Sequence, residues 1–207
     1  ELLLDDERPV EAEEQLLLAK EMVTDTKEMA HIEMHLGEIA MERGSLEEGL
    51  AHYQRVGELV PDEAESWVDL AKAYFELDNV EEAAKHFRHA LELDARDPEV
   101  YRDFSEMYQE LQEYEKAIEI LEQGLKANPD SLDLIVMLIT LYLQQEDIAG
   151  LERAIKQLAR LDPHYPALPL LRSMLPTLKA TFRSGASKTG MPPLVLPPMP
   201  ERPKKRR

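Results

Sequence analysis

The chain has 207 residues, of which 43% are hydrophobic, 24 are Lys or Arg and 42 are Asp or Glu, so its formal net charge at pH 7 is −18. The absence of cysteine excludes disulfides, thiol nucleophiles and metal centres with cysteine ligands. No apolar run approaches the roughly 18 residues of a membrane span, and no signal peptide is visible. Because the chain begins at Glu1, we expect a processed product or a piece of a longer protein.

The charge is unevenly distributed along the chain. Residues 181–207 contain seven Lys or Arg and a single acid, Glu201, which is a net charge of +6. The remaining residues contain 17 basic and 41 acidic side chains, which is a net charge of −24. An acidic body repels nucleic acid and attracts basic peptides. We therefore expect a protein or peptide partner, and no nucleic acid bound by the body.

Helices are predicted from the N-terminus onward, because Glu, Leu, Ala and Lys are abundant and glycine is scarce. Pro9 followed by acidic residues indicates a helix start, and an apolar stripe runs from Leu16 to Val23. We expect residues 1–29 to form an N-terminal capping region. Four helix pairs follow, separated by turn residues and prolines. Their predicted ranges are 30–43 with 46–59, 63–77 with 80–93, 97–111 with 114–127, and 131–145 with 148–161.

A last amphipathic helix is predicted from residue 166 to about residue 182. Pro169 fits its first turn, whereas Pro176 is expected to kink it. A solenoid needs a terminal element that covers its apolar face. We therefore interpret residues 166–183 as a C-terminal capping helix.

One pattern recurs in three consecutive segments at a spacing of 34 residues. A fixed period of about this length is typical of a solenoid built from helix–turn–helix units. A weaker copy, which includes Leu36 and Tyr53, precedes the three. The residues in register are Trp67, Tyr101 and Ile135, then Leu70, Phe104 and Leu138, then Tyr74, Tyr108 and Tyr142, and in the second half of each unit Ala83, Ala117 and Leu151.

The same residues carry a family resemblance. The pattern Trp67-x-x-Leu70-Ala71-x-x-Tyr74, followed by Ala83, Phe87 and Ala90, resembles the signature of the tetratricopeptide repeat (TPR) family. The resemblance covers about residues 30–165. It implies an all-α, right-handed solenoid of four units, 30–63, 64–97, 98–131 and 132–165, with partial capping helices at both ends.

Four positions depart from the family pattern. Glu33 replaces the large first residue of the first unit, and Ala95 replaces a proline in the second, where Pro98 follows instead. Gly124 and Leu151 replace small alanines in the third and fourth units. We expect looser packing at these positions and no change of fold.

The resemblance also implies a binding surface. In TPR proteins, side chains that project from the first helix of each unit line a concave groove. The transferred positions combine acidic with exposed apolar residues, which is typical of binding sites; a solvated face without a ligand is the alternative. We expect the groove to bind an extended basic or apolar peptide. The predicted groove residues are Met34, Glu38, Glu65, Val68, Asp69, Lys72, Phe75, Glu99, Arg102, Asp103, Glu106, Val136, Thr140 and Leu143.

One TPR subclass grips the C-terminal carboxylate of a chaperone with a clamp of Lys, Asn and Arg. The matching positions here include Glu38, Asp69 and Asp103. Their carboxylates would repel the carboxylate of the ligand, and we therefore exclude that ligand. The expected function is an adaptor or assembly scaffold. The alternative is an assembly or secretion-type chaperone that shields an apolar client.

No sequence motif indicates catalysis. The chain has no Gly-rich phosphate loop, nucleophile elbow or paired catalytic motif, so we expect neither an enzyme nor a cofactor. His31 and His35 lie on one predicted helix face with Glu38. Their order is not that of a metalloprotease motif, and we interpret them as an ordinary polar face without a metal.

Residues 184–207 differ in composition from the body. Residues 184–190 indicate a flexible linker, and residues 191–203 contain six prolines, which favour polyproline II. The spacing of Pro197, Pro200 and Arg202 resembles an SH3 ligand, and the basic end resembles a nuclear localisation signal. We expect a cytoplasmic location, with the nucleus as the alternative.

We further predict that residues 191–207 dock on an acidic groove, either of the same copy or of a neighbouring one. A purely solubilising tail is the alternative. The residues of this predicted tail motif are Leu194, Val195, Leu196, Pro197, Pro200, Arg202, Lys204, Lys205, Arg206 and Arg207.

Overall fold

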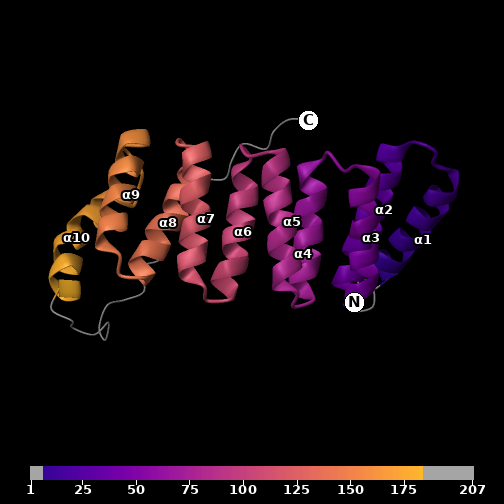
Figure 1. Cartoon of the computed structure of the whole chain (residues 1–207), viewed down its shortest axis with the longest axis horizontal. Helices are drawn as coiled ribbons and strands as arrows, with labels where there is room; N and C mark the ends of the chain where they lie inside the picture. Colours follow the sequence, from indigo (N-terminus) through magenta and orange to yellow (C-terminus); the bar gives the residue numbers. More distant parts are fainter. Residues whose placement is uncertain (1–6, 184–207) are drawn as a thin grey trace. The chain divides into compact units, whose positions relative to one another are not determined.

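A computed structural model of the protein describes residues 7–183, which form ten α-helices and no strand (Figure 1). This confirms the all-α class. The tail motif, and with it the predicted docking of residues 191–207, lies outside the described residues. The helices are α1 (Glu7–Met22), α2 (Thr26–Glu42), α3 (Leu46–Leu59), α4 (Ala64–Glu76), α5 (Val80–Leu93), α6 (Pro98–Glu110), α7 (Tyr114–Ala127), α8 (Leu132–Gln144), α9 (Ile148–Leu161) and α10 (Leu168–Arg183).

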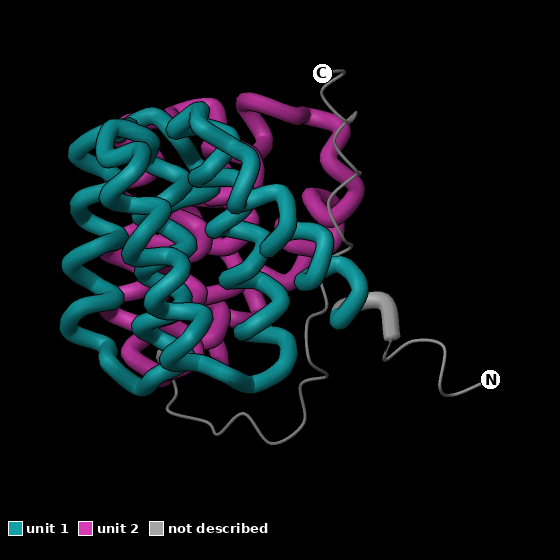
Figure 2. The backbone as a smooth tube through the Cα atoms, turned by 90° about the vertical axis from the view of Figure 1, so that its right-hand side faces the viewer, with its two compact units in different colours: residues 1–100 teal, residues 101–207 magenta. Residues whose placement is uncertain are grey.

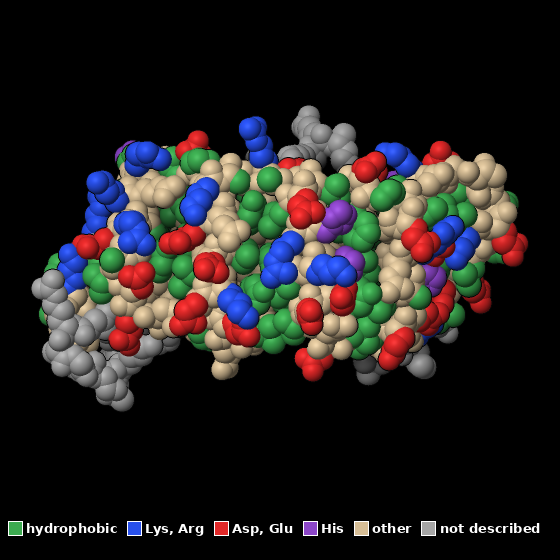
Figure 3. Space-filling view, in the orientation of Figure 1, with side chains coloured by type: hydrophobic (Ala, Val, Ile, Leu, Met, Phe, Trp, Pro, Cys, Tyr) green, Lys and Arg blue, Asp and Glu red, His purple; other side chains and the backbone are tan. Residues whose placement is uncertain are grey.

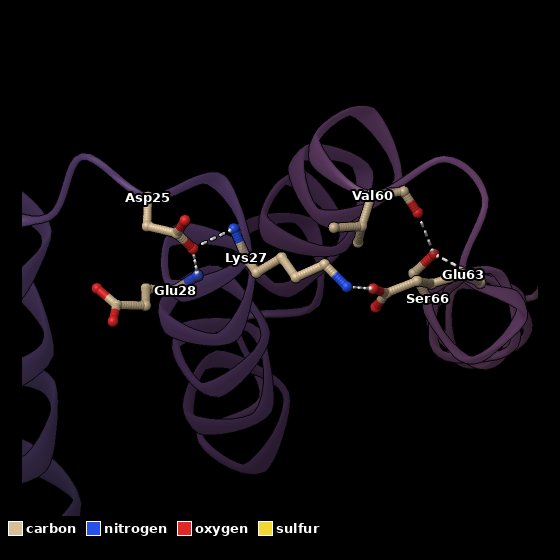
Figure 4. Close-up of polar contacts among 6 residues, drawn as sticks. All are labelled: Asp25, Lys27, Glu28, Val60, Glu63 and Ser66. Carbon is tan, nitrogen blue, oxygen red and sulfur yellow. Dashed lines mark hydrogen bonds and ion pairs between the residues drawn. The ribbon is translucent and has the colours of Figure 1, made fainter.

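The helix boundaries agree closely with those predicted. Helices α3, α5, α7 and α9 begin and end at the predicted residues. Helix α2 begins at Thr26, earlier than predicted, because Asp25 caps it. The backbone N–H groups of Lys27 and Glu28 both donate to the Asp25 carboxylate at 3.0 Å (Figure 4).

The chain forms two compact units, residues 1–100 and 101–207, and the division falls within α6 (Figure 2). In the first unit, α1 packs against α2, α2 against α3, α3 against α4 and α4 against α5. In the second, α7 packs against α8, α8 against α9 and α9 against α10. Each unit is therefore a stack of antiparallel helices that are neighbours in sequence, as a repeat solenoid requires.

Trp67 of α4 joins three helices of the first unit. Its indole Nε1 donates to the carbonyl of Pro61 at 2.8 Å. Its ring stacks on His86 of α5, with centroids 5.5 Å apart, and lies edge-on to His89 at 4.6 Å. A Cβ added to Gly57 of α3 would touch the same indole at 3.4 Å. Trp67 is thus packed between the helices of its own pair and α3 of the neighbouring pair.

A polar link connects the loop that follows α3 to the flanking helices α2 and α4. The Lys27 Nζ donates to the Glu63 carboxylate at 3.0 Å, and the hydroxyl of Ser66 donates to the Glu63 carbonyl at 2.7 Å and to the Val60 carbonyl at 3.5 Å (Figure 4). Ser66 is buried, so these bonds satisfy a hydroxyl that would otherwise be costly to remove from water.

Glu33 connects α1 to the pair formed by α2 and α3. Its side chain is buried, and its carboxylate accepts from Lys20 Nζ at 2.9 Å and from His52 Nδ1 at 2.7 Å. Burial alone would raise the pKa of Glu33, but the hydrogen bonds and positive charges of Lys20 and His52 outweigh it and lower the pKa. A pocket of about 430 Å³ adjoins this cluster. The looser packing expected at Glu33 stays a prediction.

The expectation of looser packing at Gly124 is wrong. A Cβ at this position of α7 would lie 2.8 Å from both the Leu134 Cδ1 atom of α8 and the Tyr101 Cγ atom of α6. The glycine therefore permits a close approach of three helices that alanine would obstruct. Leu151 of α9 is fully buried and has no exposed surface.

Helix α10 packs on α9 through Leu171 and Leu178, and Lys179 forms an ion pair with Glu152. Pro169 lies in its first turn, as predicted, and the helix continues through Pro176. The kink at Pro176 stays a prediction.

Between residues 7 and 183, no helix is both long and apolar enough to cross a membrane.

Candidate binding site

The predicted groove residues lie on α2, α4, α6 and α8, the first helices of the four predicted pairs. Most of them reach solvent. The exposed ones are Glu38, Glu65, Lys72, Glu99, Glu106 and Thr140, and the partly buried ones are Met34, Asp69, Phe75, Arg102, Asp103, Val136 and Leu143.

Val68 is the exception, since only 7% of its surface is exposed. It was predicted as an exposed apolar groove residue, and that prediction is wrong. The position of a residue in the repeat gives the direction of its side chain on its own helix, but not how much of that side chain the neighbouring helices cover. Burying a valine side chain is favourable. Met34 also serves packing, because it contacts the buried residues Val56, Tyr53 and Leu70.

A pocket of about 360 Å³ lies between α2, α3 and α4 of the first unit, and we call it the α2–α4 pocket. It contains two of the predicted groove residues, Asp69 and Lys72. Its apolar lining comes from all three helices and its charged lining from α4. The complete lining is Met41, Leu46, Tyr53, Asp69, Lys72, Ala73 and Glu76.

The α2–α4 pocket is negatively charged. Burial raises the pKa of the Tyr53 hydroxyl, and the charges of Asp69, Glu38 and Glu42 raise it further. Three carboxylates thus act on one buried phenol, two of them, Glu38 and Glu42, from outside the lining. Within the lining, the acids Asp69 and Glu76 outnumber the single cation Lys72. Such a site favours a positively charged ligand group.

Several residues that line this pocket or act on it were not predicted as site residues. Tyr53 was recognised as a repeat position and assigned to the core, which is correct for its ring. Glu42 and Glu76 lie in the last turns of α2 and α4, beyond the transferred groove positions. The helix endings predicted near these residues could have indicated that their side chains face the same loop region.

Glu38 lies between two sites. Its carboxylate is 2.8 Å from His35 Nδ1 on the exposed surface of α2. Both residues line a second pocket of about 460 Å³ between α1 and α2, together with Ala12, Leu16 and Ile39. Its charge nevertheless acts on Tyr53 in the α2–α4 pocket.

In the second unit, the predicted residues form local contacts. Arg102 donates from Nε to the Asp103 carboxylate at 3.0 Å, and the Thr140 hydroxyl donates to the Val136 carbonyl at 3.1 Å. A pocket of about 330 Å³ lies between α7, α8 and α9, where the Tyr142 hydroxyl donates to Glu122 at 2.6 Å. None of the predicted groove residues lines this pocket.

On the face shown in Figure 3, acidic side chains are scattered over both units and no single patch contains them. Net charge alone therefore does not locate a site, and the α2–α4 pocket is defined by its geometry. Across residues 7–183, no group of three or more His, Asp or Glu side chains is arranged to hold a metal ion.

The family profile described as tetratricopeptide repeat matches residues 40–104 and 108–175, which is more than half of the chain. The chain therefore belongs to the tetratricopeptide repeat family, as its resemblance implied. Members of this family are generally non-catalytic modules that bind protein or peptide partners. No curated protein sequence matches the chain significantly.

Solved structures of another protein, MamA, show the same fold. Two crystal structures of MamA are 18% identical to the chain, with TM-scores of 0.51 and 0.50. The matched regions cover 74% and 73% of this chain and 88% and 92% of the two MamA chains. The first TPR domain of Spaghetti (RPAP3), bound to an HSP90 peptide, is 20% identical to the chain, with a TM-score of 0.49. The matched region covers 59% of this chain and 98% of that domain. At these identities the similarity concerns the fold alone.

Proposed function

We propose that this protein is an adaptor or assembly scaffold that binds an extended basic and apolar peptide segment, and that the α2–α4 pocket receives a basic side chain of that segment. The observation that carries the proposal is that Asp69 and Glu76 line this pocket beside its apolar side chains, while the charges of Asp69, Glu38 and Glu42 raise the pKa of the buried Tyr53 hydroxyl. A pocket on which several carboxylates act favours a cation.

The lining of the pocket suits the two parts of an arginine or lysine side chain. The aliphatic stem of such a residue packs against apolar surface while its charged end stays polar. Met41, Leu46 and Ala73 supply apolar contacts, and Asp69 and Glu76 supply acceptors. The peptide backbone would run along the exposed side chains of α2 and α4, among them Glu65.

The proposal is tested with immobilised peptides of random sequence that carry either arginine or its neutral isostere citrulline at the centre. We expect the full chain to prefer the arginine set. A charge-assisted hydrogen bond contributes about 1.5–3 kcal/mol, so the preference should be about tenfold or more. In Asp69→Asn/Glu76→Gln, which keeps the shape of both side chains, the preference should disappear.

The matched control is Glu58→Gln/Glu119→Gln. It removes two exposed carboxylates from second helices and should retain the preference. Equal binding of the arginine and citrulline peptides by the natural chain would refute the proposal, as would unchanged selectivity in Asp69→Asn/Glu76→Gln.

The alternative function is an assembly or secretion-type chaperone. The apolar side chains exposed on α1, which include Leu18 and Met22, favour it because a client with apolar surface could use them. A chaperone would keep its client soluble, so the client should precipitate without this chain, whereas the partner of an adaptor should stay soluble alone. A cytoplasmic location accompanies both functions as an expectation, which cell fractionation tests.

A further inference from the structure

Helix α1 exposes an unusual amount of apolar surface. Six large hydrophobic side chains are exposed within residues 10–181, and four of them lie on this one helix. The exposed fractions are 56% for Val10, 47% for Leu17, 56% for Leu18 and 78% for Met22. A terminal element of a solenoid normally has a polar outer face that keeps the protein soluble. Helix α1 departs from that rule, as interaction surfaces do.

Acidic residues share this face. Glu11, Glu14 and Glu21 are exposed, and their helical spacing places them among the four apolar side chains. The opposite side of α1 is held to the first unit by ion pairs, from Lys20 to Glu33 at 2.9 Å and from Glu13 to Arg43 at 2.9 Å. The exposed face of α1, meaning these three acids with Val10, Leu17, Leu18 and Met22, is thus presented to solvent on an anchored helix.

We propose that the exposed face of α1 binds residues 191–207 of a second copy of this chain. That segment is complementary to the face in both its apolar and its charged side chains. It contains three consecutive apolar residues, Leu194, Val195 and Leu196, and then five basic side chains against the single acid Glu201. Opposite charges fix the register of such a contact, and the apolar residues supply the area removed from water.

The α2–α4 pocket is a poorer site for this segment. Its lining includes the cation Lys72, and it contains none of the large hydrophobic side chains that are more than a third exposed. Three adjacent apolar residues need exposed apolar surface over more than one helical turn. Helix α1 offers that surface from Val10 to Met22, and each turn also carries an acid.

We assign the segment to a second copy, so that the two partners in this contact are different parts of two identical chains. The acceptor is the first helix, and the ligand follows the last helix, α10, in sequence. A contact between unlike surfaces is heterologous and repeats from copy to copy, which gives open chains or closed rings. A segment rich in proline has little conformational freedom to lose when it binds.

The test is the mass of the full-length protein in solution, measured by sedimentation over a range of concentrations at low salt. We expect the mass to rise beyond that of one chain as concentration increases, and to fall when salt is added. Two variants should stay monomeric over the same range: Glu11→Lys/Glu14→Lys/Glu21→Lys, and Lys204→Glu/Lys205→Glu/Arg206→Glu/Arg207→Glu. When the two variants are mixed, their exchanged charges complement each other, and association should return.

The control Glu58→Lys/Glu81→Lys/Glu119→Lys changes the net charge as the α1 variant does, but on other helices, and should associate like the natural chain. Because all the reversed acids are exposed, circular dichroism should show unchanged helix content. A chain that is monomeric at every concentration overturns the proposal, even if its tail contacts its own α1. Association that survives both charge reversals, or that fails to return on mixing, also overturns it. The variant Asp69→Asn/Glu76→Gln should associate normally, which separates this proposal from that for the α2–α4 pocket.

Discussion

The substitution Gly124→Ala tests the packing of the second unit most sharply, because two effects of opposite sign meet at this residue. Alanine is favoured over glycine within a helix by about 0.5–1 kcal/mol. The new methyl group, however, would lie 2.8 Å from the Leu134 Cδ1 atom and 2.8 Å from the Tyr101 Cγ atom. Tyr101 is buried and its contacting atom lies next to the backbone, so the ring cannot simply swing away.

The magnitude follows from comparing the two effects. Forcing an extra methyl group into a well-packed core costs about 1–3 kcal/mol. Subtracting the helix preference leaves Gly124→Ala destabilising by about 0–2.5 kcal/mol. For a unit of this size, each kcal/mol shifts Tm by about 4–8 °C. We therefore expect a measurable decrease where a solvent-exposed helical glycine would give an increase.

Gly57→Ala is the matched comparison. Gly57 is also buried near the end of its helix, but a methyl group there would lie at ordinary contact distances of 3.4–3.7 Å from the Trp67 ring. We expect this variant to be more stable than the natural chain by up to about 1 kcal/mol. Thermal unfolding followed by circular dichroism measures both. If Gly124→Ala proves as stabilising as Gly57→Ala, the close approach of α6, α7 and α8 is refuted.

Three further predictions concern other parts of the fold. Trp67→Ala should lower the free energy of unfolding by about 3 kcal/mol, the lower end for large-to-small changes, since the ring is only partly buried; unchanged denaturant unfolding would contradict its packing. The pKa of Glu33 is lowered, so its contribution to stability is present above the ordinary carboxyl range of about 4.3 and is lost as pH falls through the lowered value. Amide exchange in α1 should accelerate on that acidification, and Glu33→Gln should remove the pH dependence. Burial, the hydrogen bond to Glu122 and its charge raise the pKa of Tyr142. This residue should therefore ionise above the ordinary tyrosine value of about 10, with stability lost as pH rises through the raised pKa. Ultraviolet titrations of the natural chain and of Tyr142→Phe identify the tyrosine that the substitution removes. If that tyrosine ionises near the ordinary value of about 10, the prediction is wrong.

The helices were predictable because two independent signals agree at each of them. The 34-residue period placed Trp67, Tyr101 and Ile135 at equivalent positions, and proline and turn residues marked the ends. The start of α2 was missed because Asp25 was not recognised as the cap that precedes Thr26. The charge cluster around Glu33 was also not predicted, since the period treats that position as a core residue and gives no sign that Lys20 and His52 converge on it.

The candidate site was less predictable than the fold. Transfer of groove positions identified Asp69 and Lys72, which do line the α2–α4 pocket. It failed for Val68, because a helix position does not determine whether a neighbouring element covers it. Tyr53, whose ring belongs to the core, was not expected to bring its hydroxyl among three carboxylates. Such convergence depends on how helices pack, which a one-dimensional period does not contain.

The central claim, that the α2–α4 pocket binds a basic side chain of a peptide segment, is tested most directly by site-specific photo-crosslinking. A photoreactive amino acid replaces Lys72 in the pocket, and in a parallel protein it replaces Glu58 on α3, outside the pocket. With the peptide set carrying central arginine, we predict crosslinks from position 72, adjacent to the arginine, and their loss when Asp69→Asn/Glu76→Gln is added. Crosslinks of equal yield from both positions would contradict the account. So would crosslinks from position 72 that do not lie adjacent to the arginine.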